Sequence, residues 1–427
     1  MNSDNESPII YFYVERVEKK NNIMLLDFIQ EDDYIVVTHT PQLDIDIESV
    51  SRHFVKPSMI MINNFPSSAP VHEGLILTMQ RKVFVRMIFE EGASVARNVD
   101  DSTDPAQILL TFRDGTRFAN MINNNDIKLI TESEYTDTDS FIDKFGWVVD
   151  SSDNTTKGDF KEKAEFLSSF DDTESSMIVW DVGQGNANGV YNDASAVLFD
   201  FGAPMYASVQ RTLQYYASTV SVFQNKTYGL IISHWDIDHY KMLCYAPDSF
   251  FNNIQFIAFP TRVIRYTAKQ LLNRMSSLCR NKCFPVIPTT SIKNGSFDLV
   301  IWNGPFHLYV GASRMNINNS GLFLIVSGLS SYGLFTGDRT NWNNTLNLWW
   351  PGKGQAMNIV VPHHGGNSKT IPDSNSITHP HIAAISVGNN TYSHPTQQTI
   401  NTYKARGYKI ERTDNNGTIV IPLGILY

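Results

Sequence analysis

The sequence predicts an α/β (α+β) protein with two domains, and three observations lead to this prediction. The chain has 427 residues, which is more than one ordinary hydrophobic core accommodates. Residues 1–150 contain short apolar segments rich in β-branched and aromatic residues, whereas strand-like and helix-like segments alternate over residues 176–427. Residues 151–175 are polar and rich in Ser, Asp and Thr, so we predict a linker there that can hold a short helix.

The first domain is predicted to be the smaller one and β-rich. Five segments have the composition of strands, and the turn RDGT after the last of them predicts a hairpin. These segments are IIYFYVERV, NIMLLDFI, YIVVTHT, KVFVRMIF and QILLTF. No motif in residues 1–150 assigns a function, and recognition of a protein partner is a role left open for them.

The composition and the charge narrow the classes of function. Hydrophobic residues make up 42% of the chain and charged residues 18%, as in globular proteins, and the net charge is −9. A large non-specific nucleic-acid surface needs an excess of Lys and Arg, so this charge argues against one. It leaves room for a local basic groove, to which Arg314, Arg339 and Lys369 could contribute.

The cysteines and the apolar runs predict where the chain resides. The chain has three cysteines, Cys244, Cys279 and Cys283. Three is an odd number, and the last two, spaced as CxxxC, have no second pair to match them. This pattern indicates free thiols in a reducing compartment. The acidic N-terminus shows no signal peptide, and no apolar run approaches the length of a membrane span. We therefore expect a cytoplasmic chain with no membrane segment.

Acidic and histidine side chains gather at the ends of predicted strands in the second half. SHWDIDHY, residues 233–240, follows an apolar run, and further strands end in acids or histidines. These ends carry Asp181, Asp338, His363, His364 and His394. So many carboxylates together would repel one another and lose hydration, whereas divalent ions would neutralise them and take histidine nitrogens as further ligands.

The spacing within SHWDIDHY predicts two ions rather than one. In an extended segment His234 and Asp236 lie on the same side, so both can bind one ion. Asp238 and His239 are adjacent and would point apart, toward a second ion, and Asp338 from a distant strand end could bridge the two. Each motif alone could be a polar loop or a helix cap. Their joint occurrence at strand ends is what favours a metal centre.

The motifs together resemble the metallo-β-lactamase fold, in the branch of the soluble domain of the competence DNA-uptake protein ComEC and its stand-alone relatives. The resemblance covers about residues 176–427 and departs from the family pattern at Asn186, where that branch has an acid, and in YKMLCY after His239. The matching segments are WDVGQGNA, SHWDIDHY, LFTGDRT, VVPHHGGNS, ISVGNNTYSHPT and RTDNNGTIVI.

The resemblance implies an αββα sandwich, with two mixed sheets face to face, helices outside and two divalent ions, Zn²⁺ or Mn²⁺, at one edge. By position it implies that His363 is a metal ligand in preference to His364, although the choice is close. His394 would be a ligand or, like His364, a proton donor to the leaving group. Asp238 or Asp338 would orient the attacking water or accept its proton. Asp181 would support the metal ligands without binding an ion itself.

The activity implied is metal-dependent hydrolysis, with phosphodiesters of nucleic acid or nucleotides as the expected substrates. A lactonase or thioesterase acting on other esters is one alternative. An inactive protein of this fold that binds a partner is another, and Asn186 favours it slightly. Trp235, Tyr240, Trp342 and Tyr392 could stack on a base or pack in the core.

Overall fold

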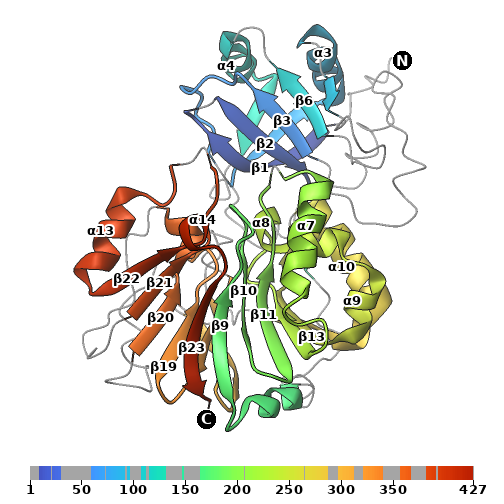
Figure 1. Cartoon of the computed structure of the whole chain (residues 1–427). Coiled ribbons are helices and arrows are strands. Elements are labelled where there is room, and N and C mark those ends of the chain that lie inside the picture. Colours follow the sequence, from blue (N-terminus) through green and yellow to red (C-terminus); the bar gives the residue numbers. More distant parts are fainter. Residues whose placement is uncertain are drawn as a thin grey trace. The chain divides into compact units, whose positions relative to one another are not determined.

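The chain forms two compact units in the computed structural model (Figure 1). The first unit comprises Met1–Trp147 together with Val263–Leu271, and the second comprises Val148–Arg262 and Leu272–Tyr427. The structure describes residues 9–20, 22–29, 59–72, 74–91, 94–96, 107–111, 115–130, 147–148, 164–205, 207–263, 265–286, 297–311, 321–339, 356–366, 381–390 and 393–426.

Unit 1 is built on a seven-stranded sheet with the order β5-β6-β3-β2-β1-β4-β7. Its elements are β1 (Ile9–Glu18), β2 (Ile23–Phe28), β3 (Met59–Asn63), β4 (Ile76–Gln80), α3 (Arg81–Glu91), β5 (Ser94–Ala96), β6 (Gln107–Thr111), α4 (Gly115–Asn123) and β7 (Ile127–Ile130). Both helices pack on the sheet, because Phe84 of α3 and Phe118 of α4 share one apolar core with Phe12 and Phe28.

Two local predictions for unit 1 are wrong. KVFVRMIF, predicted as a strand, lies in helix α3, where Val83, Phe84 and Met87 form a helical apolar face toward the core. Tertiary packing overrides the β-branched composition here. RDGT does not lead into a hairpin, because α4 begins at Gly115. The predicted strand YIVVTHT, residues 34–40, lies outside the described residues.

The segment Val263–Leu271 joins unit 1 through buried polar contacts. Arg265 Nε lies 2.6 Å from Glu15 Oε2, and the Arg265 guanidinium stacks 4.7 Å from the centre of the Tyr13 ring. Thr267 Oγ1 donates to Asp27 Oδ2 at 2.7 Å. Burial raises the pKa of Asp27 to about 6, although this hydrogen bond opposes the shift.

Unit 2 contains two further seven-stranded sheets, with the orders β15-β13-β12-β11-β10-β9-β23 and β16-β17-β18-β19-β20-β21-β22. The strands of the first are β9 (Glu174–Val179), β10 (Ala187–Tyr191), β11 (Ser195–Phe201), β12 (Thr227–Ile231), β13 (Ile254–Pro260), β15 (Cys283–Val286) and β23 (Ile419–Ile425). The strands of the second are β16 (Phe297–Asn303), β17 (Phe306–Gly311), β18 (Leu322–Ser327), β19 (Ser331–Phe335), β20 (Ala356–Val360), β21 (His381–Ile385) and β22 (Tyr408–Arg412).

The two sheets pack face to face over one core. Phe199 of β11 and Ile231 of β12 share a buried cluster with Phe335 of β19 and Val360 of β20. The rings of Phe199 and Phe335 lie 5.6 Å apart, centre to centre. Side chains from both inner faces therefore make a sandwich core.

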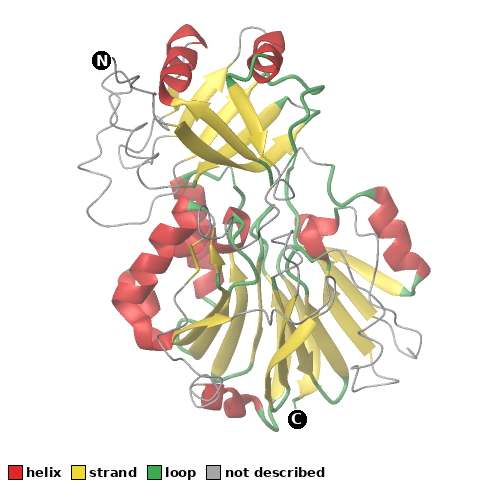
Figure 2. Ribbon diagram, turned by 180° about the vertical axis from the view of Figure 1, so that it is seen from behind, coloured by secondary structure: helices red, strands yellow, loops and turns green. Residues whose placement is uncertain are grey.

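Helices cover the outer faces of the sandwich (Figure 2). The helices of unit 2 are η2 (Ala164–Phe170), α7 (Val209–Val220), α8 (Ile237–Tyr245), α9 (Asp248–Asn253), α10 (Tyr266–Cys279, whose first turns belong to unit 1), η3 (Arg280–Lys282), η4 (Pro362–Gly365), α13 (Gln397–Ala405) and α14 (Thr413–Asn416). Tyr403 of α13 is buried against the outer face of the second sheet. The predicted αββα arrangement is confirmed.

Two further features complete the fold. The closing segment YKIERTDNNGTIVIPLG contains an Asn-Gly pair, which commonly predicts a hairpin. It forms none here, because β22 pairs with β21 and β23 pairs with β9 of the other sheet. Leu167 and Phe170, within the stretch predicted as a linker, are buried in the sandwich core. β8 (Trp147–Val148) and β14 (Arg262–Val263) form a short two-stranded sheet.

Cys244, Cys279 and Cys283 are thiols and not disulfides, as expected, and all three are buried. Within the described residues, no helix combines the length and the apolar character that a bilayer crossing needs.

Candidate metal centre

The predicted cluster begins where β12 ends. β12 runs parallel to β11 and β13, and α8 starts only six residues after its last residue, with Asp236 at the N-cap. His234 thus lies in the segment between β12 and α8, whereas Asp238 and His239 lie in the first turn of a helix whose nine residues are all buried. The two halves of SHWDIDHY therefore have different backbone conformations, which the sequence pattern did not show.

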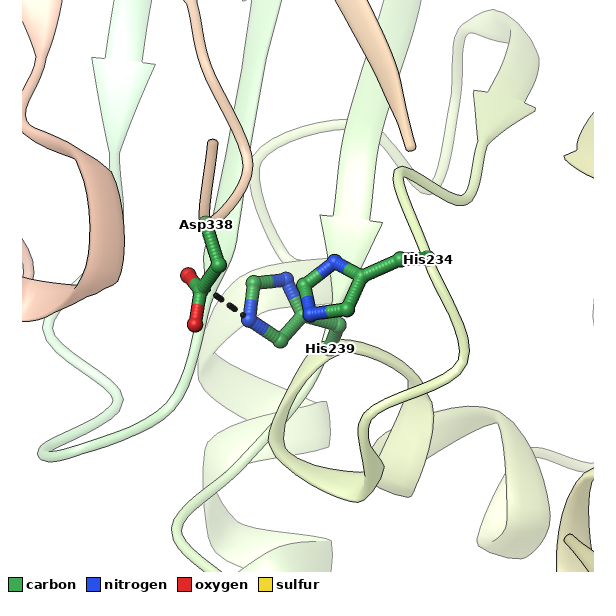
Figure 3. Close-up of side chains that lie close together, drawn as sticks. All are labelled: His234, His239 and Asp338. Atoms are coloured by element: carbon green, nitrogen blue, oxygen red, sulfur yellow. Dashed lines mark ion pairs between the residues drawn. The ribbon is translucent and has the colours of Figure 1, made fainter. Parts of the chain in front are cut away.

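Five buried side chains converge in two overlapping groups. In one group the ligand atoms of His234, His239 and Asp338 lie within 4.8 Å of one another (Figure 3), and in the other those of Asp238, His239 and His364 do. His239 Nε2 is 3.1 Å from Asp338 Oδ1, and His364 Nε2 is 3.2 Å from Asp238 Oδ2. Imidazole and carboxylate are the usual ligands of zinc and manganese, so the group could bind a divalent ion.

Hydrogen bonds outside the cluster fix the orientation of two imidazoles. His239 Nδ1 lies 2.7 Å from Asp200 Oδ2, and His364 Nδ1 lies 2.8 Å from the backbone oxygen of Ser386. A carboxylate and a carbonyl only accept hydrogen bonds, so both Nδ1 atoms carry the hydrogen. The Nε2 atoms of His239 and His364 are then the ones left to face the acids.

The same reasoning applies to His234 through a relay. Ser233 Oγ lies 2.8 Å from Asp200 Oδ2, to which it donates, and 2.9 Å from His234 Nδ1. With its hydrogen directed at Asp200, the hydroxyl accepts from His234 Nδ1. His234 Nε2 makes no hydrogen bond in the described part of the chain, although Asp236 Oδ2 lies 3.3 Å away. Three imidazoles thus direct Nε2 into one acidic cluster, a donor set that fits a divalent ion.

Charges within the cluster shift the protonation of its members. Burial alone would lower the pKa of His239, but the carboxylates of Asp338 and Asp200 raise it well above the usual value. Burial alone would raise the pKa of Asp338, but His239 and His363 hold it well below its usual value. Without a metal ion, the two residues form a charged pair in which a proton supplies the positive charge.

Asp200 is a site residue that the motif reading missed. It is fully buried and holds His239 and Ser233 at once, with Ser233 N donating to its Oδ1 at 2.7 Å. Its backbone has a φ of +62°, a region that Asp and Asn tolerate better than most residues. The available signal was an acid in the otherwise apolar strand SAVLFDF.

A glycine allows the strand that carries Asp200 to approach α8. A Cβ atom on Gly202 would lie 1.7 Å from the backbone oxygen of Asp238, closer than any two non-bonded atoms come. Gly202 N also donates to the backbone oxygen of Asn186 at 2.8 Å. The end of β11, the first turn of α8 and the DVGQGN loop are thus in direct contact.

The adjacent histidines of VVPHHGG face different partners. His364 belongs to a donor group, whereas His363 Nδ1 lies 2.6 Å from Asp338 Oδ2 and its backbone N donates to Asp338 Oδ1 at 3.2 Å. Both residues have a φ of +52°, a strained conformation for non-glycine residues that often occurs at functional sites. His363 thus contacts Asp338, and its assignment as a metal ligand stays a prediction.

Two of the predicted site residues, His394 and Asp181, lie outside the two groups of possible metal ligands. His394 is half-buried, with its ring 5.3 Å from that of His363, and Asn390 holds its backbone through two hydrogen bonds. Asp181 is exposed, and its Oδ1 accepts from Gly183 N at 3.5 Å. Within the described residues, the contacts of Asp181 do not join it to the cluster.

The aromatic and basic residues singled out from the sequence lie in the interior where the structure describes them. Trp235 and Tyr240 are buried, and Trp235 Nε1 donates to the backbone oxygen of Pro260 at 2.8 Å. Arg339 is buried over the ring of Phe323, and burial lowers its pKa to about 10. Arg314, Trp342, Lys369 and Tyr392 lie outside the described residues.

The sequence of the chain is similar to that of a competence protein. No protein-family model matches the chain. A competence protein of Neisseria gonorrhoeae, ComA, is 26% identical over 259 residues, which are 59% of this chain and 33% of that protein. The chain therefore spans about a third of the length of this relative.

Several solved structures are similar to part of the chain. Tm1679, a metal-dependent hydrolase of the β-lactamase superfamily, gives a TM-score of 0.34 at 10% identity over 58% of this chain and 98% of its own. Human tRNase Z, short form, gives 0.33 at 11% identity over 58% and 99%. Zn²⁺-bound PqqB from Methylobacterium extorquens gives 0.34 at 8% identity over 57% and 99%.

Because these TM-scores are low, the assignment of the fold rests on the two sheets, their shared core and their outer helices. The similarity to the competence protein agrees with the branch to which the motifs point. Unit 2 thus has the αββα sandwich that the resemblance of its motifs implied.

Proposed function

We propose that unit 2 is a metal-dependent hydrolase that activates water at a centre of two divalent ions, Zn²⁺ or Mn²⁺, and cleaves phosphodiesters. The observation that carries the proposal is the common orientation of the three imidazoles, whose Nε2 atoms face Asp238 and Asp338 while their Nδ1 atoms are held from outside. Such outer hydrogen bonds are the usual support of metal-binding histidines.

The ligands divide naturally between two ions. One imidazole nitrogen binds one ion, so His239 cannot serve both donor groups. Asp238, His239 and His364 form one complete set. His234 would then hold the other ion together with Asp236, whose Oδ2 lies 3.3 Å from His234 Nε2. Asp338 would contribute to both sites, because its Oδ1 lies 3.1 Å from His239 Nε2 and the residue also belongs to the group of His234.

The protein side chains then have distinct tasks in hydrolysis. A divalent ion lowers the pKa of a water molecule that it binds and polarises the oxygen of the bond to be broken. Asp238 would orient the attacking water and accept its proton. His363 positions Asp338 through two hydrogen bonds. His394 is half-buried beside His363, so it can meet solvent and substrate and donate a proton to the leaving oxygen.

Phosphodiesters are the favoured substrate class on two grounds. The motifs resemble the DNA-uptake branch, and the relative found by sequence is a competence protein. As for the ions, a carboxylate-rich ligand set suits Mn²⁺ and similar oxygen-preferring cations. The net charge of −9 favours a nucleotide or a short strand over a long polymer.

The test combines metal analysis with turnover. The purified full chain, Asp338→Asn and the exposed control Asp193→Asn are assayed for bound metal and for cleavage of bis(p-nitrophenyl) phosphate with Mn²⁺ or Zn²⁺ added. We expect about two ions per chain for the wild type and the control, and loss of turnover in Asp338→Asn. Cleavage of p-nitrophenyl acyl esters alone would favour the lactonase or thioesterase alternative. An unmodified chain with neither ion nor turnover would refute the proposal.

A further inference from the structure

Asn186 occupies an unusual position for a neutral residue. It is buried, and its carboxamide nitrogen lies 3.2 Å from His239 Nε2 and 3.4 Å from Asp338 Oδ1, the two atoms that would face an ion. Its backbone N donates to the oxygen of Asp238, and its backbone oxygen accepts from Gly202 N, each at 2.8 Å. The side chain is therefore held at the donor atoms from two sides.

A carboxamide can present either of its ends to the cluster. A half-turn about its last bond exchanges the nitrogen, which donates only, for the oxygen, which can bind a cation. An NH₂ group facing a divalent ion would be repelled, so a bound ion selects the orientation with the oxygen inward. At 3.2 Å from His239 Nε2, the Asn186 side chain is close enough for both groups to bind one ion.

Asn188 provides the partner that the turned carboxamide needs. In the structure Asn188 Nδ2 donates to Asn186 Oδ1 at 3.3 Å, and Asn188 Oδ1 is buried without a hydrogen-bond partner among the described residues. A matching half-turn of Asn188 lets its oxygen accept from Asn186 Nδ2. The pair of amides can thus exchange orientations together when an ion binds.

We propose that the carboxamide oxygen of Asn186 is a metal ligand, binding the same ion as His239. This inference rests on the proposed metal centre and extends it to a residue where the resembled branch has an acid. A neutral oxygen ligand supplies one negative charge fewer than a carboxylate. An amide oxygen suits an oxygen-preferring divalent cation. Loss of the Asn186 side chain should therefore weaken the binding of Mn²⁺ more than the binding of Zn²⁺.

The experiment measures metal affinity directly. Mn²⁺ and Zn²⁺ are titrated calorimetrically into the metal-free full chain and into Asn186→Ala, Asn186→Asp and the control Gln184→Ala, a buried residue of the same loop. We expect Asn186→Ala to weaken Mn²⁺ binding by about tenfold or more and Zn²⁺ binding by less. Asn186→Asp should bind Mn²⁺ at least as tightly as the wild type, and Gln184→Ala should match the wild type.

The aspartate variant separates a ligand from a hydrogen-bond donor. If Asn186 only donates a hydrogen bond to Asp338, a carboxylate in its place weakens binding as alanine does. That result, or unchanged affinity in Asn186→Ala, overturns the inference and leaves the proposed centre intact. Absence of any metal binding in the wild type overturns both. Because Asn186→Asp is isosteric, its result decides even where the alanine variant does not fold.

Discussion

His363 Nδ1 lies 2.6 Å from Asp338 Oδ2, whereas the neighbouring His364 directs Nε2 at Asp238. The two adjacent histidines thus contact different acids, so replacing each of them by alanine should have a different effect. We expect His364→Ala to reduce the bound metal from about two ions to about one. His363→Ala should keep both ions and lower turnover, because it removes only a contact that positions Asp338. Metal analysis beside kcat checks this, and the reverse pattern would contradict it.

The charged pair of His239 and Asp338 predicts how the metal-free protein responds to pH. The raised pKa of His239 contributes stability that is complete below its unfolded value of 6.5 and is lost as pH rises through the higher folded value. The lowered pKa of Asp338 contributes stability above 3.8 that is lost as pH falls through the lower folded value. The melting temperature of the metal-free chain should therefore fall as pH rises above about 6.5.

Bound metal should remove much of this alkaline loss, because the ion replaces the proton on His239. The same competition predicts that metal affinity weakens as pH is lowered. Melting curves of metal-free and metal-bound protein across pH 6–10 test both statements, with Asp193→Asn as the control. Parallel curves with and without metal would contradict the prediction.

Asp200 should be essential for metal affinity although it is not proposed as a ligand. In Asp200→Asn the positive φ is tolerated, but the side chain loses one of the two acceptors that hold Ser233 and His239. We expect a loss of metal affinity of about 10- to 100-fold. Calorimetric titration measures it, and circular dichroism shows whether the fold is retained. Wild-type affinity in a folded variant would mean that the orientation of His239 does not depend on Asp200.

The sequence was informative where a functional residue follows an apolar strand. His234 and Asp338 could be located because β12 and β19 are buried runs with a clear end. Their convergence also follows from physical chemistry, since buried acids need a compensating charge. Asp200 was not predicted as a site residue, because it lies inside its strand, where no motif distinguishes it from core positions.

Other features depend on backbone geometry that local composition does not encode. The division of roles between His363 and His364 follows from two consecutive residues with a φ of +52°. The path from β22 to β23 leads through α14 into the other sheet, where β9 offers a free edge, so an Asn-Gly pair was insufficient evidence for a hairpin. In α3, burial of Phe84 and Met87 outweighs a β-rich composition.

Gly202 provides a test of the packing that brings β11 against α8. In Gly202→Ala the new Cβ would overlap the backbone oxygen of Asp238, and backbone cannot move aside as a flexible side chain can. We expect a loss of about 3 kcal/mol or more in the free energy of unfolding, together with weaker metal binding.

Gly407→Ala is the matched control, because nothing lies within 4 Å of its Cβ position and only its φ of +85° is strained. That control should lose about 1 kcal/mol and bind metal normally. Urea unfolding of both variants decides the matter, and equal losses would show that the close approach at Asp238 does not contribute to stability.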